Sequence, residues 1–544
     1  MQTNKGIVMT KKFDIYFTSD SHGKIMPVDY ASGERKACGL LNLSEQIEKS
    51  GNTLVLDGGD NLQGTPFLTY YLEHASSFSF HPCAEGFNAC GLDAYTLGNH
   101  DFNFDYDAIA AFAGAMKADL ICANVEDLGG KLSIKKWEIR TLENGLRIGL
   151  TGAVTGHVNV WEKKEHLKKL RVTDPVSALK EALDEMKDLC DVTVCIYHGG
   201  YEEAMDGSHK LLSDSTENQA CRIARETSFD ILLTGHQHMA VEGLDLYGTW
   251  TVQPPANAEK FIHLCGEVDG KETVSVTSKL LPVGDQTRRD IYEKLFPLED
   301  LTEEWLDQPI GSFEEELTPE SKLDCALYGS KVARFFNAVQ FSSINGRSDN
   351  IHDGQSHGDP GKGDDPSRIY ADISAVSLGN QPIGFPKEVS IRDVYTAYPF
   401  ANNTVVKRIS GADLREALER CATYLDLDSE GRPYISDVFM KPKVEHYNYD
   451  FYAGIDYVFD LRKPRGERVV RLCRLDGSPI AAEDQLNLVT SDYRATGTGG
   501  YEMIGRCPTV YTGADNVQDL IIDYIRNHKP VQIMDNVRFR VIYE

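Results

Sequence analysis

Six short β-rich runs alternate with helical patterns in the first half of the chain, and this alternation constrains the fold more than any other feature. Each run ends in or beside Gly, Asp, Asn or His, and the runs span residues 13–20, 52–60, 118–125, 146–154, 191–200 and 229–238. Between them, "DPVSALKEALDEMKDL" predicts a helix with Asp174 as its N-cap and Pro175 at its first position. Such alternation is typical of an α/β layered domain, in which polar groups at the carboxyl ends of strands converge on one crevice.

The residues that follow these runs form an inventory of metal ligands. In chain order the strand ends supply Asp20-x-His22, Gly59-Asp60, Asn99-His100-Asp101, His198 and His236-x-His238. One such piece alone is usually a capped turn, but five in order at strand ends indicate a metal site. Imidazole and carboxylate donors without cysteine suit zinc, manganese, iron, cobalt or nickel and argue against a structural thiolate site. Seven candidate ligands, one of them a carboxylate able to bridge, predict two divalent ions about 3.5–4 Å apart.

The motifs carry a family resemblance. "DSH", "GGD", "GNHD", "YHGG" and "GHQH" resemble the ordered motifs of calcineurin-like metallophosphoesterases. The segment "GDNLQGTPFLTYY" resembles their branch of 5′-nucleotidases and 2′,3′-cyclic-nucleotide 2′-phosphodiesterases, and the resemblance covers nearly the whole chain. It implies an α/β fold in which an N-terminal four-layer αββα sandwich precedes a C-terminal α/β substrate domain of the 5′-nucleotidase type.

The resemblance also implies a role for each matching residue. Asp60 takes the position of the bridging carboxylate, and His100 that of the catalytic histidine that contacts the scissile phosphate and assists the leaving oxygen. The expected ligands of the two divalent ions are Asp20, His22, Asp60 and His238 for one, and Asp60, Asn99, His198 and His236 for the other.

Length and charge set the domain organisation and the class of partner. A chain of 544 residues is too long for one core, since single cores stop growing near about 250–300 residues. We expect a metallophosphoesterase domain over 1–285, a charged helical linker over 286–312 and a nucleotide-binding domain over 313–544. With 83 acidic against 56 basic residues, the net charge of -27 argues against polymeric nucleic acid or a membrane surface as the partner.

Two stretches of the second half have a clear local pattern. The segment "ISGADLREALERCATYL" predicts a helix capped by Ser410, with Asp413 completing a capping box. Residues 345–368 are rich in Gly, Asp and Ser without an apolar period, and they predict a long exposed loop or a disordered segment.

Two aromatic residues of the second half are candidates for binding a nucleobase. "AYPFANNTVV" and "SDYRATGTGGYEM" resemble the family segments that place one ring on each side of the base, which points to Phe400 and Tyr493. Stacking suits this task because every base has a π-face. By composition alone, a core Phe and a core Tyr remain the alternative; only the resemblance and the adjacent Gly-rich turn favour the clamp.

Two departures from the 5′-nucleotidase pattern favour the cyclic-phosphodiesterase branch. Residue 103 is Asn where 5′-nucleotidases tend to carry an Asp that pairs with the catalytic histidine, so Asn103 orients His100 without adding charge. The stretch "ADISAVSLGNQPIGF" has no Arg where that family presents a phosphate-binding arginine. A monoester dianion would lose a cationic partner there, whereas a cyclic diester, which carries one negative charge, loses less binding energy when the arginine is absent.

The sequence therefore predicts a dinuclear metal-dependent phosphoesterase whose first substrate is a nucleoside 2′,3′-cyclic phosphate. A 5′-nucleotidase or nucleotide-sugar hydrolase on the same scaffold is the alternative, and a non-catalytic nucleotide-binding module is the alternative from another class. The N-terminal segment has no apolar core of signal-peptide length, so a cytoplasmic monomer or small homo-oligomer is expected. The 12 cysteines have no Cys-x-x-Cys pair and are expected to be reduced thiols.

Overall fold

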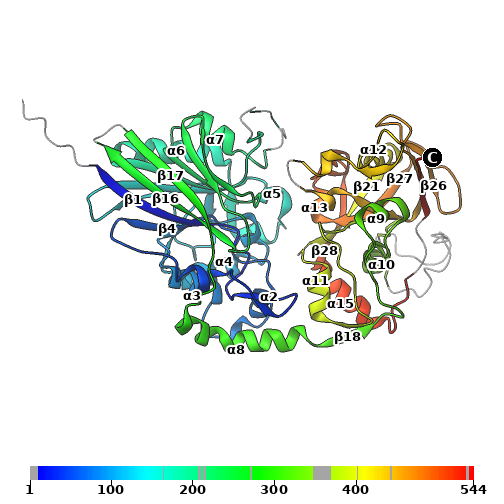
Figure 1. Cartoon of the computed structure of the whole chain (residues 1–544), viewed down its shortest axis with the longest axis horizontal. Helices are drawn as coiled ribbons and strands as arrows, with labels where there is room; N and C mark the ends of the chain where they lie inside the picture. Colours follow the sequence, from blue (N-terminus) through cyan, green and yellow to red (C-terminus); the bar gives the residue numbers. More distant parts are fainter. Residues whose placement is uncertain are drawn as a thin grey trace, which may run out of the picture. The chain divides into compact units, whose positions relative to one another are not determined.

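The computed structural model describes residues 10–544 except for residues 163, 206–208, 210, 212–215, 270–272, 347–368, 401, 442–443 and 534–537. Most of the predicted 345–368 loop thus lies outside the described residues. The chain divides into two compact units, Met1–Glu304 and Trp305–Glu544, each of which has its own sheets (Figure 1). None of the described helices combines the length and apolar character that crossing a membrane requires.

Unit 1 contains two large sheets. The first has the order β17(Thr273–Pro282), β16(Lys260–Asp269), β1(Lys11–Thr18), β4(Thr53–Asp57), β5(Ala94–Tyr95), β6(Asp119–Ile121) and β8(Ile134–Lys135). The second has the order β14(Val241–Leu246), β15(Thr249–Gln253), β13(Ile231–Thr234), β12(Val192–His198), β10(Arg147–Val154) and β9(Trp137–Thr141). Strands β1, β4, β5, β6 and β8 run parallel, as do β10, β12, β13 and β15, so both sheets have carboxyl ends at which loops can converge.

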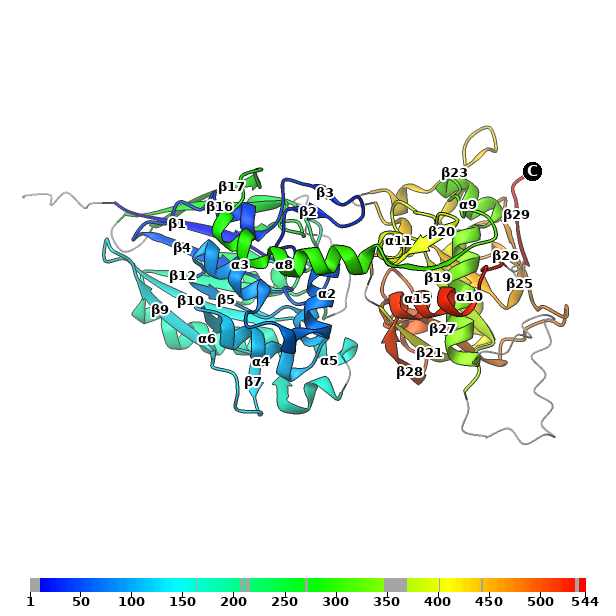
Figure 2. The same cartoon turned by 90° about the horizontal axis from the view of Figure 1, so that it is seen from below.

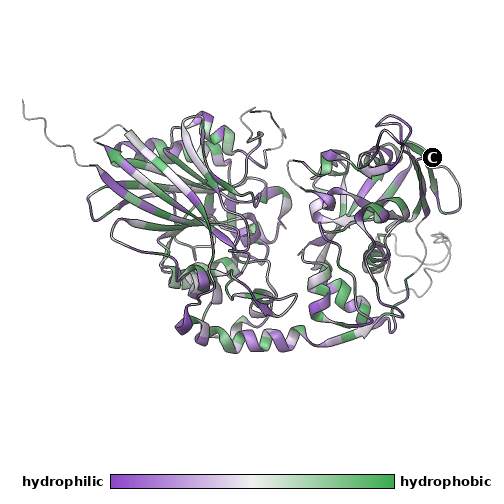
Figure 3. Cartoon of the chain, in the orientation of Figure 1, coloured by the Kyte–Doolittle hydropathy of each residue, from purple (hydrophilic) through white to green (hydrophobic). Residues whose placement is uncertain are grey.

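The two sheets pack face to face and helices cover their outer faces. Side chains of β1 such as Phe13 and Ile15 share one buried cluster with Leu150 of β10 and Val194 of β12, and apolar residues run along these strands in Figure 3. Figure 1 shows α6 and α7 on one side of the sheets and α3 and α4 on the other. The helices of unit 1 are α1(Leu40–Leu43), α2(Pro66–Glu73), α3(Pro82–Cys90), α4(Tyr106–Ala115), α5(Val158–Trp161), α6(Pro175–Met186), α7(Ala220–Glu226) and α8(Arg289–Leu306). The αββα layering predicted for the first half is confirmed.

Unit 2 is built on a mixed five-stranded sheet. Its order is β24(Asp450–Ala453), β19(Ile373–Ser377), β27(Gln485–Ser491), β21(Asn403–Ser410) and β28(Thr509–Asn516). A smaller sheet has the order β26(Val469–Arg474), β25(Ile455–Asp460) and β29(Arg538–Ile542). The helices are α9(Lys322–Tyr328), α10(Lys331–Asn345), α11(Ile391–Ala397), α12(Gly411–Ala422), α13(Asp492–Ala495), α14(Glu502–Gly505) and α15(Val517–Asn527), several of which are labelled in Figure 2. The second half is therefore a separate α/β unit, as predicted.

Helix α8 crosses the boundary between the two units. Leu295 and Leu298 on this helix are fully buried, and Tyr30 Oη donates a hydrogen bond of 2.7 Å to Glu299 Oε2. These contacts attach the middle of α8 to unit 1. The segment predicted as a charged helical linker is helical over Arg289–Leu306, and it packs on unit 1 through an apolar face.

His81 is buried in unit 1 without a hydrogen-bond partner among the described residues for either ring nitrogen. It packs against the rings of Tyr71 and Phe112, and burial lowers its pKa to about 4. A histidine of the unfolded chain takes up a proton near pH 6.5, whereas the folded chain resists protonation of His81 until about pH 4. The contribution of neutral His81 to the free energy of unfolding is therefore fully present above pH 6.5 and is lost as the pH falls toward 4.

We expect the wild-type protein to lose about 2 kcal/mol more stability than a His81→Phe variant when the pH falls from 7.5 to 5.0. Urea unfolding at both pH values, followed by tryptophan fluorescence, measures the difference. The exposed His74, which stacks on Tyr70, provides the control, since His74→Phe should leave the pH sensitivity unchanged. Equal pH sensitivity in wild type and His81→Phe would contradict the prediction.

Candidate metal centre

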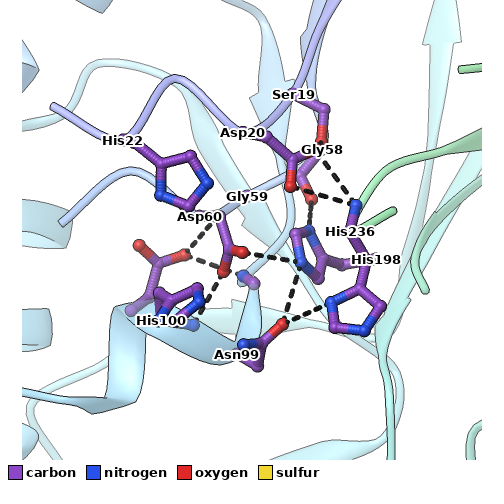
Figure 4. Close-up of polar contacts among 12 residues, drawn as sticks. Ser19, Asp20, His22, Gly58, Gly59, Asp60, Asn99, His100, His198 and His236 are labelled. Atoms are coloured by element: carbon purple, nitrogen blue, oxygen red, sulfur yellow. Dashed lines mark hydrogen bonds and ion pairs between the residues drawn. The ribbon is translucent and has the colours of Figure 1, made fainter. Parts of the chain in front are cut away.

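The segments at the carboxyl ends of β1, β4, β5, β12 and β13 bring the predicted metal ligands together, and all of these except His238 are labelled in Figure 4. The backbone there is unusual: five of the candidate ligands have left-handed φ angles, namely Asp20 at 56°, His22 at 49°, Asp60 at 60°, His236 at 73° and His238 at 54°. Such angles are uncommon for residues other than glycine and are retained mainly where the surroundings enforce them. The sharp turns aim consecutive side chains into the same small volume.

Glycines allow two of these loops to approach each other. A Cβ atom on Gly98 would lie 2.2 Å from Asp60 Oδ1, and one on Gly59 would lie 2.2 Å from the backbone nitrogen of Gly98. No other residue fits at either position without a shift of the loops. The "GGD" and "GNHD" motifs therefore carry glycine because their backbones are in contact.

The first donor group consists of Asp20, His22 and His238. His22 Nε2 lies 3.0 Å from His238 Nε2, which in turn lies 3.3 Å from Asp20 Oδ1. His22 Nδ1 is 2.9 Å from the carbonyl of Gln63, which fixes Nδ1 as the protonated nitrogen and leaves the Nε2 lone pair free. Asp20 also accepts the backbone N–H of His236, at 3.0 Å, and so links this group to the second.

The second donor group consists of Asp60, Asn99, His198 and His236. His198 Nε2 lies 3.1 Å from Asp60 Oδ2 and 3.2 Å from Asn99 Oδ1, while His236 Nδ1 lies 2.8 Å from the same Asn99 oxygen. His198 Nδ1 donates to the carbonyl of Gly58 at 2.7 Å, which orients the ring so that Nε2 faces Asp60 and Asn99 (Figure 4). The side chains of Asp60 and His198 are almost completely buried.

These contacts gather imidazole nitrogens with carboxylate and amide oxygens in one small volume, as a cation site requires. With Nδ1 turned to the carbonyls of Gln63 and Gly58, His22 and His198 both direct Nε2 into this volume. A divalent ion in each group would satisfy all these atoms at once, and the set contains only the nitrogen and oxygen donors that such ions accept. The residues present therefore fit a dinuclear centre.

Asp60 is placed to serve both groups. Burial opposes its ionisation, but the charges of His198, His100 and His22 outweigh burial and hold the pKa of Asp60 well below its usual range. His198 belongs to the second donor group and His22 to the first. The backbone carbonyl of Asp60 also accepts the N–H of His22 at 2.9 Å, so Asp60 contacts a residue of each group, as the proposed bridging position requires.

His100 lies on the 3₁₀ turn Asn99–Phe102 next to the centre, and its ring centroid is 5.5 Å from that of His22. Its Nδ1 is 2.8 Å from Asn103 Oδ1. The amide of Asn103 donates from Nδ2 to Glu162 Oε2 at 2.9 Å, which fixes the orientation of the amide. Asn103 Oδ1 consequently accepts from the His100 Nδ1–H, and Nε2 is the nitrogen that remains for a ligand.

Three acidic residues surround the centre, of which Asp101 stands in a sequence motif without an assigned role, and Glu162 and Glu217 were not found by sequence reasoning. Asp101 accepts the backbone N–H groups of Asp60, Asn61, Leu62 and Gly98 at 2.7–3.0 Å, and it thereby holds the two contacting loops together. Burial and the neighbouring Asp60 raise the pKa of Asp101 to about 6. Glu162 holds Asn103, and Glu217 lies 3.0 Å from His236 Nε2. Only Asp101, within "GNHD", stood beside a motif; Glu162 and Glu217 lie in loops that have no pattern of their own.

Glu217 sets the tautomer of His236. Burial opposes its ionisation, but the hydrogen bond and the charge of His236 lower the pKa of Glu217. An ionised carboxylate at Nε2 keeps the proton there and presents the Nδ1 lone pair to the centre, the arrangement by which outer carboxylates strengthen histidine ligands.

We expect Glu217→Ala to weaken metal binding or phosphoesterase activity by about 10–100-fold, since the ring of His236 loses its orienting partner. Titration of the stripped protein with Mn²⁺, followed by activity, measures the change. Glu181→Ala serves as the control because Glu181 pairs with Lys136 on the surface. An unchanged metal affinity in Glu217→Ala would exclude this role.

The segments that carry Phe400 and Tyr493 lie at the same end of the neighbouring strands β21 and β27 of the unit 2 sheet. Thr404 of β21 pairs with Ser491 of β27, and the N–H of Asn403 donates to Asp492 Oδ2 at 2.9 Å, so the two ring-bearing segments are neighbours. Both rings are partly exposed, at 41% for Phe400 and 37% for Tyr493. The core-residue alternative is therefore wrong for both, and the clamp itself stays a prediction.

The loop that lacks the expected arginine follows β19, and a lysine approaches it. Lys322 Nζ lies 3.3 Å from the carbonyl of Gly379, in a cavity that His446 and Tyr424 also line. Burial lowers the pKa of Lys322 to about 8. Unit 2 thus offers a cation beside this loop, although the loop sequence contains none.

Comparison with known proteins accounts for both units. Residues 13–240 match the family described as calcineurin-like phosphoesterase, and residues 326–506 match the family described as 5′-nucleotidase, C-terminal domain. The trifunctional nucleotide phosphoesterase protein YfkN of Bacillus subtilis is 24% identical over 95% of this chain, which spans only 38% of that protein. The 2′,3′-cyclic-nucleotide 2′-phosphodiesterase/3′-nucleotidase of Haemophilus influenzae is 24% identical over 96% of this chain and 84% of its own length. A solved structure of a putative 5′-nucleotidase from Staphylococcus aureus is 28% identical, with a TM-score of 0.82 over 98% of this chain and 100% of that one.

Proposed function

Because the chain belongs to the calcineurin-like metallophosphoesterases that carry a 5′-nucleotidase C-terminal domain, we propose that it hydrolyses nucleoside 2′,3′-cyclic phosphates at a dinuclear metal centre. Family membership makes the chain a nucleotide phosphoesterase. The observation that carries the preference for a cyclic diester is that the partner of His100 is the neutral amide of Asn103, at 2.8 Å.

The residues of the centre have distinct tasks in this reaction. When bound, two divalent ions polarise the phosphoryl oxygens and lower the pKa of an attacking water. Asp20, His22 and His238 would hold one ion, Asn99, His198 and His236 the other, and Asp60 both. His100, oriented by Asn103, offers Nε2 to the leaving ribose oxygen and stabilises the charge that develops there.

The electrostatics of the site favour a substrate with a single negative charge. Asn103 orients the imidazole but cannot stabilise an imidazolium by charge, and the segment 371–385 contains no arginine. A 5′-monophosphate carries close to two negative charges at neutral pH and needs more cationic partners than a cyclic diester does.

A 5′-nucleotidase activity is the second candidate, and Lys322 favours it. Its ammonium group lies beside the arginine-free loop and could partner a monoester dianion in place of the arginine. The S. aureus structure, a putative 5′-nucleotidase, points in the same direction.

Product analysis distinguishes these activities. The purified chain, stripped of metal and reloaded with manganese or zinc, is offered 2′,3′-cyclic AMP, 3′-AMP and 5′-AMP, and the products are separated by chromatography. We expect the cyclic substrate to have the highest kcat/KM. A higher kcat/KM for 5′-AMP would overturn the proposal in favour of the 5′-nucleotidase. Nucleotide binding without turnover of any substrate would identify a non-catalytic module.

A further inference from the structure

A second cluster of metal-binding side chains lies on the outer face of the seven-stranded sheet. Asp14 is on β1, and His263 and Cys265 are on the neighbouring antiparallel strand β16. Asp14 pairs directly with Cys265, and His263 is two residues away on the same face. Phe13 and Ile15 point into the core between the sheets, so Asp14 and its two partners face outward.

The three donor atoms are spaced as a tetrahedral ion requires. Asp14 Oδ1 lies 3.0 Å from His263 Nε2 and 3.2 Å from Cys265 Sγ, and the sulfur lies 3.7 Å from the same His263 nitrogen. Metal–ligand distances of about 2.0–2.3 Å at tetrahedral angles place such donors about 3.3–3.6 Å apart. The sulfur–nitrogen separation is close to this range and the two separations from Asp14 Oδ1 are slightly shorter, and all three donor atoms lie within 4.8 Å of one another.

The histidine is held in place independently of its partners in the cluster. Its ring stacks on Tyr16, with centroids 4.5 Å apart and planes 4° from parallel. A fixed imidazole reduces the conformational entropy that a ligand loses when it binds a metal. His263 and Asp14 also line a surface hollow together with Glu48, which leaves room for a fourth ligand.

Nearby cations are largely neutralised by acidic neighbours. Lys12 pairs with Glu267 at 2.5 Å, and Lys49 pairs with Asp93 at 2.8 Å. Lys279 is the register partner of His263 on β17.

Cys265 is the exposed cysteine of a chain whose other thiols are buried or partly buried, so its sulfur is accessible to an ion.

Hydrogen bonds alone offer another account of the cluster. The thiol and the imidazole N–H can both donate to Asp14 Oδ1, which would satisfy the group without a metal. The 3.7 Å separation of the sulfur from the His263 nitrogen fits a weak hydrogen bond as well as a common ion, so the two accounts differ only in whether an ion binds.

We propose that Asp14, His263 and Cys265 bind a thiophilic divalent cation of the Zn²⁺ type, with Glu48 or a water as the fourth ligand. Six residues of extended chain separate Asp14 from Asp20, so this zinc site lies roughly 20 Å from the candidate metal centre. An ion there ties β1 to β16 and stabilises unit 1 by an amount that rises with the logarithm of its affinity. The site would act on stability, not on catalysis.

Cobalt substitution tests the zinc site separately from the candidate metal centre. The candidate metal centre has only nitrogen and oxygen donors, so a thiolate-to-cobalt charge-transfer absorption can come only from a cysteine site. The full chain, stripped of metal and titrated with Co²⁺, should develop this absorption at one ion per chain, and Zn²⁺ should abolish it. Cys265→Ser and His263→Gln should lose the absorption and bind one ion fewer per chain.

Two control variants make the result decisive. Cys190→Ser changes the other cysteine that is not fully buried and should keep the absorption. A variant with Asp60→Asn in the candidate metal centre should also keep it, which separates this proposal from the proposed function. Cys265→Ser should retain its phosphoesterase activity within about twofold, showing that it folds. No thiolate absorption in the wild type, or the same absorption in Cys265→Ser, would overturn the proposal.

Discussion

Replacing Asp60 with asparagine is expected to lower the kcat/KM for nucleotide hydrolysis by at least about 10³-fold, and to lower the metal content below two ions per chain. The carboxylate lies 3.1 Å from His198 and is close enough to His22 for each histidine to affect its pKa. Loss of its charge weakens both proposed ion sites at once. Several kcal/mol of transition-state stabilisation then disappear, and each 1.4 kcal/mol is about tenfold in rate.

A neighbouring aspartate provides the matched control for this experiment. Asp57 is equally buried and only three residues away, but its Oδ1 accepts hydrogen bonds from the N–H of Gly59 and from Asn61 Nδ2. Asp57→Asn should keep two ions per chain, as measured by elemental analysis. If Asp60→Asn kept both ions and normal turnover while Asp57→Asn lost them, the bridging role would belong to Asp57.

The buried ion pair of unit 2 gives the largest expected effect on stability. Both side chains of Arg494 and Asp450 are only 2% exposed, with Nε 2.8 Å from Oδ2 and Nη2 3.0 Å from Oδ1. Arg494 also donates to the carbonyls of Tyr447 and Thr498 and lies 4.0 Å from the ring centre of Tyr501. Arg494→Met should destabilise unit 2 by about 3–5 kcal/mol, because Asp450 is left buried without a partner.

Calorimetry on the full chain measures this loss as a lower melting temperature, by about 10 °C for a unit of this size. Adding Asp450→Leu to Arg494→Met should restore part of the stability, since the uncompensated charge is then removed as well. Arg506→Met is the control: Arg506 pairs with Asp413 and Glu416 but is 57% exposed, so its loss should cost less than about 1 kcal/mol. Equal effects of Arg494→Met and Arg506→Met would contradict the prediction.

Local signals in the sequence predicted the framework of both units. Asp174 caps α6 and Ser410 caps α12, each by accepting a backbone N–H three residues ahead, because short polar side chains satisfy the free amides of a first turn. Strand-end motifs located the candidate metal centre because parallel strands end at the same edge. These inferences needed only residues that are close in sequence.

What the sequence did not reveal depends on contacts between distant segments. Glu217 meets His236 across 19 residues, and Glu162 meets Asn103 across 59, without a pattern in the loops that carry them. The packing of α8 onto unit 1 was missed because a charged helix with one apolar face resembles a linker. The left-handed backbone of the ligand residues could have been suspected, since Asp and His are enriched there, but it could not be assigned.

That backbone has a consequence for protein engineering. Asp20, His22, Asp60, His236 and His238 reach their positions through left-handed φ angles that residues other than glycine seldom adopt. Grafting the same seven side chains onto another α/β scaffold would therefore misplace most of them by more than the roughly 0.5 Å that a functional site tolerates. A transplant of this centre has to include the turns and the paired glycines with the ligands, so the smallest portable unit is the set of loops and not the set of residues.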